Sequence, residues 1–199
     1  FENLEAKQKL FADIEAIAKP DAVLASNTSS LRLEDIAAGL KHPSRLIGIH
    51  FFNPVDKMPL VEVVEGKDSD PQALKRGMAF VRKIDKLALP VKSAPGFLVN
   101  AVLAPYMQEA MRCVDEGIAP EVVDEAALAF GMPLGPIELA DTVGLDIAVA
   151  AGKQLASGIS EPPRKLMELV NAGHLGRKTG RGFYTYNQGK PQKGAVGQV

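Results

Sequence analysis

A histidine and a glutamate stand twelve residues apart in LIGIHFFNPVDKMPLVEV, residues 46 to 63. His50 ends one hydrophobic run, and Glu62 is the only charged residue of LVEV in the next. A carboxylate in apolar surroundings is costly unless it is paired. If the loop between the two runs turns the chain back, the carboxylate can reach the imidazole. It would then fix the tautomer of the ring and stabilise the imidazolium, so that His50 could act as a general base.

Other readings of these residues stay open at this point. A histidine that ends a strand is often only packed or solvated, and Glu62 could face solvent on an edge strand. Ser29 and Ser30 are more often helix caps than nucleophiles. The sequence contains no G-x-S-x-G elbow, which argues against a hydrolase of that type. It contains no Cys/His cluster with metal-ligand spacing, so no metal site is predicted.

Helices and strands alternate in the first half of the chain. Apolar residues recur at helical spacing over residues 3–18, and Asp70 and Pro71 are typical of the N-cap and first residue of a helix running to about Ile84. A short helix is expected at LRLEDIAAGL. Four apolar runs have the length of buried strands: AVLAS, RLIGIHFF, LVEVVEG and LALPVK. This alternation predicts βαβ units and a mostly parallel sheet.

The polar loops that follow two of these strands could face one cleft. Ligands of parallel α/β sheets bind at the carboxyl ends of the strands. SNTSS follows the first strand, and the segment from His50 to Asn53 follows the second. The two loops would supply hydroxyl groups, amides and one imidazole to the same site.

The second half of the chain has a different character, because no strand-like run occurs between Phe97 and Val170. A boundary near residues 92–96 therefore separates an α/β part from an all-helical part. We predict domains over residues 1–94 and 95–187, followed by a polar tail over 188–199. Asn100 lies early in the first long helix among apolar neighbours, where an amide needs a partner, and it could be aimed at the cleft.

Composition excludes several classes of partner. The formal net charge of −1 gives no support for a nucleic acid or an anionic membrane as partner. A single cysteine, no signal-peptide pattern and no apolar run of roughly 20 residues favour a cytoplasmic location without a membrane segment. The basic, glycine-rich GRKTGRGFYTY could bind phosphate, but it lacks the helix that follows a P-loop, and a structural turn is predicted.

Several segments together resemble the L-3-hydroxyacyl-CoA dehydrogenase family, in order and over nearly the whole chain. The HFFNP motif with its twelve-residue step to glutamate and the PGF-hydrophobic-VN motif are jointly highly specific. The C-terminal segments are more similar to the dehydrogenase part of the bacterial multifunctional fatty-acid oxidation enzyme than to the short monofunctional form. The matching segments are FENLEAKQKLF, ASNTSSL, GIHFFNPVDKMPLVEVV, APGFLVN, GMPLGPIELADTVGLD and GRKTGRGFY.

This resemblance implies the C-terminal part of a Rossmann-like NAD-binding domain followed by a helical dimerisation domain. The implied reaction is the NAD-dependent oxidation of a (3S)-hydroxyacyl-CoA to a 3-ketoacyl-CoA in fatty-acid β-oxidation. By position, His50 would be the general base and Glu62 its orienting carboxylate. Ser29 would hydrogen-bond the substrate oxygen near the nicotinamide, and Asn100 would position the substrate.

The resemblance also implies partners for the chain. Glu2, Lys7 and Asn53 match positions at which the family contacts NAD. The substrate would be an acyl-CoA, and the helical domain would form a homodimer. Two alternatives remain: a 3-hydroxybutyryl-CoA dehydrogenase of short-chain metabolism, or a non-catalytic dimerisation module. Retention of the histidine, glutamate, serine and asparagine together speaks against the second.

The sequence departs from the family pattern in one major way, since it contains no G-x-G-x-x-G turn. We expect this turn upstream of Phe1, in a longer protein of which this chain is a fragment. The fragment is then expected to bind NAD weakly or not at all and to have little activity. Exposed strand edges would favour association into dimers or larger species. A smaller departure is Ala101, where the family often has arginine.

Overall fold

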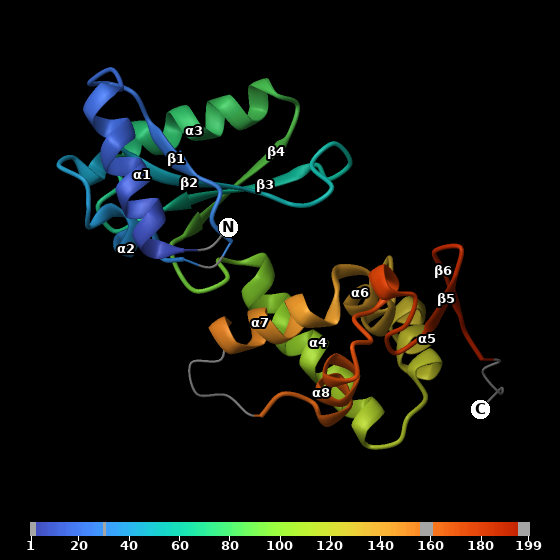
Figure 1. The fold of residues 1–199 in the computed structure, drawn as a ribbon. Helices are drawn as coiled ribbons and strands as arrows, with labels where there is room; N and C mark the ends of the chain where they lie inside the picture. The colour runs from blue at the N-terminus through green and yellow to red at the C-terminus, as the bar shows by residue number, and fades with distance from the viewer. Residues whose placement is uncertain (1–2, 30, 156–160, 195–199) are drawn as a thin grey trace. The chain divides into compact units, whose positions relative to one another are not determined.

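The computed structural model describes residues 3–29, 31–155 and 161–194. The chain divides into two compact units, Phe1–Ala101 and Val102–Val199. In Figure 1 the first unit runs from blue to green and the second from green to red. Within the described ranges, no helix combines the length and the apolar character that crossing a bilayer requires.

The first unit is built on a four-stranded sheet in the order β1 (Leu24–Ser26), β2 (Leu46–Phe51), β3 (Leu60–Glu65) and β4 (Leu87–Lys92). The pairs β1–β2 and β3–β4 are parallel, as predicted, whereas β2 and β3 are antiparallel. The antiparallel pair has a simple cause. Residues 52–59 join its strands without a helix, and a parallel crossover needs a dozen or more residues.

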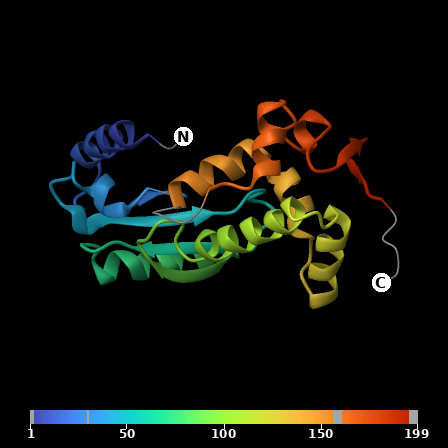
Figure 2. The same cartoon turned by 90° about the horizontal axis from the view of Figure 1, so that it is seen from below.

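Helices cover both faces of this sheet. Figure 2 shows α1 (Leu4–Ile17) and α2 (Leu33–Ala37) on one face and α3 (Pro71–Lys83) on the other. A short 3₁₀ turn, η1 (Pro43–Arg45), leads into β2. Each face has its own hydrophobic cluster, because successive strand residues point to opposite sides. The α1/α2 side buries Phe11, Leu24, Leu33, Ile36, Ala37, Leu46, Val64 and Phe97, and the α3 side buries Ile47, Ile49, Val61, Val63, Ala73 and Val81.

The helix starts of the first unit follow from capping residues. The side chain of Asn3 accepts the N–H of Ala6 at the start of α1. The carboxylate of Asp70 accepts the N–H of Gln72 at the start of α3, where Pro71 is the first helical residue, so the predicted N-cap is confirmed. The N-cap of α2 is Arg32, so the predicted cap at Ser29 is wrong, and Ser30 lies outside the described residues. The hydroxyl oxygen of Ser93 accepts the N–H of Leu33.

The second unit is mainly helical. The helix α4 (Val99–Asp115) leads into it, with Pro105 inside the helix. Its core contains Ala110, Met111, Ile137, Ala140, Leu145, Leu166, Leu169 and Tyr184. The further elements are α5 (Pro120–Phe130), α6 (Pro136–Val143), α7 (Leu145–Leu155), α8 (Arg164–Asn171), the 3₁₀ turn η2 (Arg177–Thr179), β5 (Thr185–Asn187) and β6 (Lys190–Gln192).

The hairpin β5–β6 departs from the all-helical expectation and extends into the range predicted as a polar tail. Its two-residue turn consists of Gln188 and Gly189, which both have positive φ angles, 49° and 76°. Two central residues with positive φ are the signature of the hairpin turn that matches strand twist. The sequence NQGK held this signal, but its polar composition outweighed it in the prediction.

Candidate active site

The carboxylate of Glu62 and the ring of His50 form a buried pair. The two residues lie directly opposite each other in the β2–β3 register, so their side chains share the α1/α2 face of the sheet. The distance from His50 Nδ1 to Glu62 Oε2 is 2.8 Å. Glu62 is fully buried and His50 is 6 % exposed. The sequence had left this pairing open, and the register explains how twelve residues bring the two groups together.

The second carboxylate oxygen of Glu62 is also engaged. Oε1 accepts the backbone N–H groups of Leu98 at 3.0 Å and Val99 at 2.9 Å, at the start of α4. Burial by itself would raise the pKa of Glu62, but the His50 ring and these two N–H groups outweigh it and hold the pKa below the ordinary value of 4.5. Glu62 is therefore an anion, and the proton between the two side chains belongs on His50 Nδ1.

Two aromatic rings flank the imidazole. Phe52 lies with its centroid 4.7 Å from that of His50, and Phe97 lies at 5.6 Å, both in edge-on geometry. The ring is thus held by one carboxylate and two apolar side chains. With Nδ1 donating to Glu62, Nε2 is the nitrogen that can take a proton from a bound hydroxyl group. This arrangement can perform general base catalysis.

The loop after β1 is tied to the end of β2. Asn27 Oδ1 accepts the backbone N–H of Phe51 at 2.9 Å. Thr28, fully buried, accepts the N–H of Leu31 through its hydroxyl oxygen. These bonds hold half-buried Ser29 in a loop anchored beside the strand that carries His50. The predicted gathering of the two loops at one sheet edge agrees with this geometry.

The other predicted site residues have different positions. Asn53 is exposed in the loop after β2, and Lys7 is half-buried within α1. Asn100 is half-buried and directly follows Val99, whose N–H binds Glu62. Glu2 lies outside the described residues. None of these placements assigns a role, so their cofactor and substrate contacts stay predictions.

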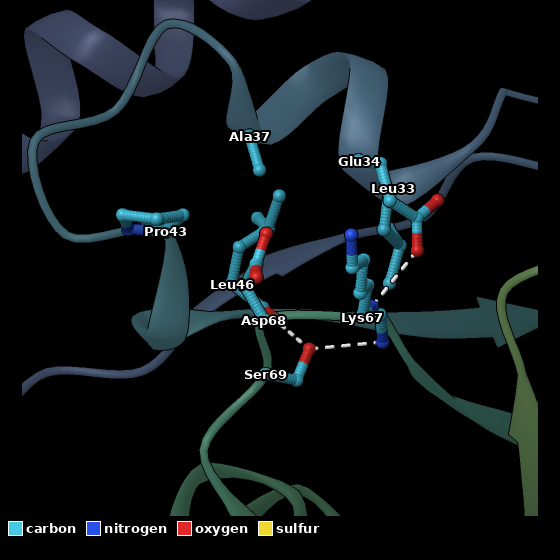
Figure 3. A pocket seen from close by; sticks show the side chains of 9 residues that line it. Leu33, Glu34, Ala37, Pro43, Leu46, Lys67, Asp68 and Ser69 are labelled. Atoms are coloured by element: carbon cyan, nitrogen blue, oxygen red, sulfur yellow. Dashed lines mark hydrogen bonds between the residues drawn. The ribbon is translucent and has the colours of Figure 1, made fainter.

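A small hollow lies at the other end of β2. Figure 3 shows the Ser69 hydroxyl, which donates to the carbonyl oxygen of Leu46 at 2.6 Å, and the backbone N–H of Lys67, which donates to Glu34 Oε1 at 2.9 Å. The cavity of about 10 Å³ has room for about one water molecule. Leu46 begins β2, whereas His50 stands near its end. This hollow is too small for a nucleotide or an acyl group.

The second unit contains buried carboxylates that the sequence reasoning missed. Asp124 is fully buried and accepts the N–H groups of Ile137 at 2.7 Å and Glu138 at 3.2 Å, at the start of α6. It also accepts the hydroxyl of Tyr184 at 2.8 Å and lies 3.3 Å from the amino group of Lys193. The only signal was a carboxylate directly after two valines in the helical run PEVVDEAALAF, and it was weak because Glu121 and Glu125 stand in the same run.

Asp141 holds the turn of the GRGFY motif. Its carboxylate accepts the N–H groups of Phe183 and Tyr184, each at 2.9 Å, and the hydroxyl of Tyr186 at 3.2 Å. Burial raises the pKa of Asp141 despite these bonds. A Cβ atom at Gly182 would lie 2.0 Å from Asp141 Oδ1, so the turn requires glycine there. The motif serves the structure of the second unit.

Sequence reasoning also missed the contribution of Phe97 and of the backbone after it. Apart from Asn100, the segment APGFLVN is distinguished only by the family resemblance. Nothing in its composition indicates that Leu98 and Val99 offer N–H groups to a carboxylate 36 and 37 residues earlier. A prediction of that contact requires the position of the α4 start relative to β3.

Two family models match the chain. Residues 1–94 match the model described as "3-hydroxyacyl-CoA dehydrogenase, NAD binding domain", and residues 96–186 match "3-hydroxyacyl-CoA dehydrogenase, C-terminal domain". A "fatty acid oxidation complex subunit alpha" of Vibrio campbellii is 43 % identical over 195 residues, which are 96 % of this chain and 28 % of the relative. A "probable 3-hydroxybutyryl-CoA dehydrogenase" of Bacillus subtilis is 44 % identical over 193 residues, 94 % of this chain and 67 % of the relative.

Solved structures agree with these relatives. The crystal structure of 3-hydroxybutyryl-CoA dehydrogenase from Escherichia coli K12 superposes with a TM-score of 0.91 at 37 % identity, over 100 % of this chain and 43 % of that one. The (S)-3-hydroxybutyryl-CoA dehydrogenase from Ralstonia eutropha gives a TM-score of 0.88 at 38 % identity, over 94 % of this chain and 69 % of that one. The chain thus spans between about a quarter and about two thirds of these relatives.

Proposed function

Because the chain belongs to the 3-hydroxyacyl-CoA dehydrogenase family, whose cofactor is NAD, we propose that it carries the proton-transfer part of the oxidation of (3S)-hydroxyacyl-CoA to 3-ketoacyl-CoA. The observation that carries this proposal is the buried His50–Glu62 pair at 2.8 Å. A module kept only for dimerisation would have no need for an ionised carboxylate fixed on an imidazole beneath two aromatic rings.

His50 acts as the base in this proposal. Nε2 takes the proton of the substrate 3-hydroxyl, and the positive charge that develops on the ring is balanced by Glu62 on Nδ1. Ser29 hydrogen-bonds the substrate oxygen, and Asn100 orients the substrate. The chemistry that bound NAD would supply is the acceptance of a hydride from C3, which together with loss of the hydroxyl proton would leave a carbonyl. In the reverse direction His50 returns the proton to the carbonyl oxygen.

The residues present fit the nicotinamide side of NAD. The bond from the Phe51 N–H to Asn27 joins two loops at one sheet edge, where Ser29 and Asn53 provide a hydroxyl and an amide. Such uncharged groups suit a ribose and a carboxamide. We assign Glu2, Lys7 and Asn53 to NAD by family position. The sequence has no G-x-G-x-x-G turn for the pyrophosphate.

Weak binding of NAD by this 199-residue chain is therefore part of the proposal. Calorimetric titration of the chain with NADH tests it, and micromolar affinity would refute it. Turnover is measured separately with 3-hydroxyacyl-CoA and NAD. His50→Gln should lower kcat by roughly 10²–10⁴ wherever turnover is measurable. A near-normal rate in that variant would show that His50 is not the base.

A short acyl chain is a second candidate for the substrate. Both a fatty-acid oxidation subunit and 3-hydroxybutyryl-CoA dehydrogenases are among the similar proteins, so chain length is the open choice. Comparing kcat/KM for four-carbon and sixteen-carbon substrates decides between them. A preference for the longer substrate would support β-oxidation of long chains, and a preference for the shorter one would support the 3-hydroxybutyryl-CoA dehydrogenase alternative.

We assign residues 1–94 to the NAD-binding part and 95–187 to a helical part that dimerises. The matched ranges 1–94 and 96–186 support this assignment. Within the second unit, Phe130 is 87 % exposed at the end of α5, which suits a surface that another copy covers. Light scattering of the chain and of Phe130→Asp tests the dimer, and a monomer in both would contradict it. A cytoplasmic location stays a prediction.

A further inference from the structure

The backbone just before α4 adopts an unusual conformation next to the His50–Glu62 pair. Gly96 and Phe97 both have positive φ angles, 73° and 51°. Glycine adopts this region freely, whereas for a bulky residue such as phenylalanine it is a strained outlier. The turn is closed by the Phe97 N–H, which donates to the carbonyl oxygen of Ala94 at 3.0 Å. A strained residue is therefore fixed one and two positions before the N–H groups that bind Glu62.

The side chain of Phe97 explains why this position is not left to glycine. The ring is 5 % exposed and belongs to the cluster of Phe11, Leu33 and Val64. Its edge-on contact with His50 has an angle of 62° between the ring planes. Such edge-on ring pairs are favourable beyond the burial of their surface, which helps to offset the cost of the strained backbone.

We propose that Phe97 is a positioning residue for His50. Its ring restrains the imidazole directly, and its left-handed backbone aims the Leu98 and Val99 N–H groups at Glu62, which in turn holds Nδ1. Both routes keep the proton on Nδ1 and leave Nε2 facing the substrate. The inference rests on the proposed role of His50 as the base, but its structural content can be measured without turnover.

Proton–nitrogen correlation spectra of the histidine rings in the full chain test this proposal. His50 is assigned by its loss in His50→Gln, and spectra are taken at mildly alkaline pH. The unmodified chain should show a single tautomer with the proton on Nδ1. Mixed tautomers are expected in Phe97→Leu, which keeps an apolar side chain of similar bulk without the aromatic edge. They are also expected in Phe97→Gly, which in addition relaxes the backbone. Phe97→Tyr should restore the single tautomer.

The matched control is Asp85→Gly. Asp85 has a φ angle of 57° at the end of α3, so this change relaxes a left-handed residue of the same unit without altering the ring contacts of His50. It should leave the His50 spectrum unchanged. Where turnover is measurable, Phe97→Leu should lower kcat by about 10-fold to 10²-fold with little change in KM, as expected for a misplaced catalytic group.

The outcomes separate this inference from the proposed function. A single Nδ1 tautomer in folded Phe97→Leu and Phe97→Gly would overturn the role of Phe97, whatever the turnover. If Phe97→Gly does not fold, the comparison of Phe97→Leu with Phe97→Tyr decides. Mixed tautomers in Phe97→Leu and Phe97→Gly would support the positioning effect of Phe97. Normal turnover in His50→Gln beside this result would refute only the role of His50 as the base.

Discussion

Both units of the protein bury carboxylates, and the partners of these carboxylates differ. In the first unit Glu62 shares its two oxygens between backbone N–H groups and an imidazole. In the second unit Asp124 and Asp141 accept backbone N–H groups and tyrosine hydroxyls. The three carboxylates resemble one another, since each accepts the backbone N–H groups of a helix start or a turn. Burial of an acid is therefore no sign of chemistry by itself.

The side chain that each carboxylate binds, an imidazole in the first unit and tyrosine hydroxyls in the second, determines what each site can do. An imidazole gains and loses a proton near neutral pH, so Glu62 stabilises a charge that can come and go. The tyrosines of the second unit cannot do this, because burial and their aspartate neighbours raise the pKa values of Tyr184 and Tyr186 well above the ordinary range. In the second unit the buried carboxylates thus hold the fold together, whereas in the first unit the buried carboxylate also binds an imidazole.

Removal of a carboxylate from the second unit should have the largest effect on stability. Asp124→Ala leaves two backbone N–H groups, a tyrosine hydroxyl and Lys193 without their acceptor. We expect a loss of about 3–5 kcal/mol in the free energy of unfolding, measured by urea titration. Asp146→Ala, which removes an exposed ion pair with Lys178 and a backbone contact at Ile147, should cost about 1 kcal/mol or less. Similar losses in both variants would contradict this account.

A carboxylate-to-amide change distinguishes the two units by activity. Glu62→Gln can still accept the N–H groups of Leu98 and Val99, but its amide cannot balance an imidazolium or fix its tautomer. Wherever turnover is measurable, kcat should fall about 100-fold or more, equivalent to at least about 2.7 kcal/mol. Asp141→Asn should reduce stability and leave the kcat of the folded protein unchanged. An equal loss of kcat in both variants would remove the distinction.

The pH dependence of stability should have opposite signs in the two sites. Glu62 has a lowered pKa, so the folded state binds a proton there less readily than the unfolded state does. Its contribution to the free energy of unfolding is therefore full above pH 4.5 and is lost as the pH falls through the lowered pKa. Asp141 has a raised pKa, so the free energy of unfolding falls as the pH rises from 3.8 through the raised value.

Each carboxylate contributes a slope of at most about 1.4 kcal/mol per pH unit, the smallest of the three effects. Urea unfolding across the acidic range measures it in the unmodified chain and in the two amide variants. Glu62→Gln should weaken the loss of stability on acidification, and Asp141→Asn should weaken the opposing gain. The same slope change in both variants would show that the two sites do not differ as described.

Part of this organisation was readable in the sequence. The twelve-residue step from His50 to Glu62 and the charged residue in an apolar run suggested the pair without deciding it, and the antiparallel β2–β3 register is what places the two residues opposite each other on one face. The caps at Asp70 and Pro71 were predictable from local chemistry alone. The antiparallel step from β2 to β3 was hidden by the general rule that alternating helices and strands give parallel sheets.

Other features depend on contacts between distant segments. The bonds from Leu98 and Val99 to Glu62 and the cap of α6 by Asp124 join residues whose spacing carries no periodic signal. The hairpin β5–β6 rests on a two-residue turn within a polar stretch. Sequence patterns give the period of an element, whereas these contacts depend on how the elements pack.

The chain separation of these contacts has a consequence for the order of folding. The His50–Glu62 contact closes a short loop of 12 residues, which a growing chain can form early. The bond from the Tyr184 N–H to Asp141 spans 43 residues, and that from the Tyr184 hydroxyl to Asp124 spans 60. During synthesis the N–H groups of Ile137 and Glu138 can reach Asp124 early, but neither aspartate gains its Tyr184 partner until that residue has emerged, so the helical unit completes its buried polar contacts late.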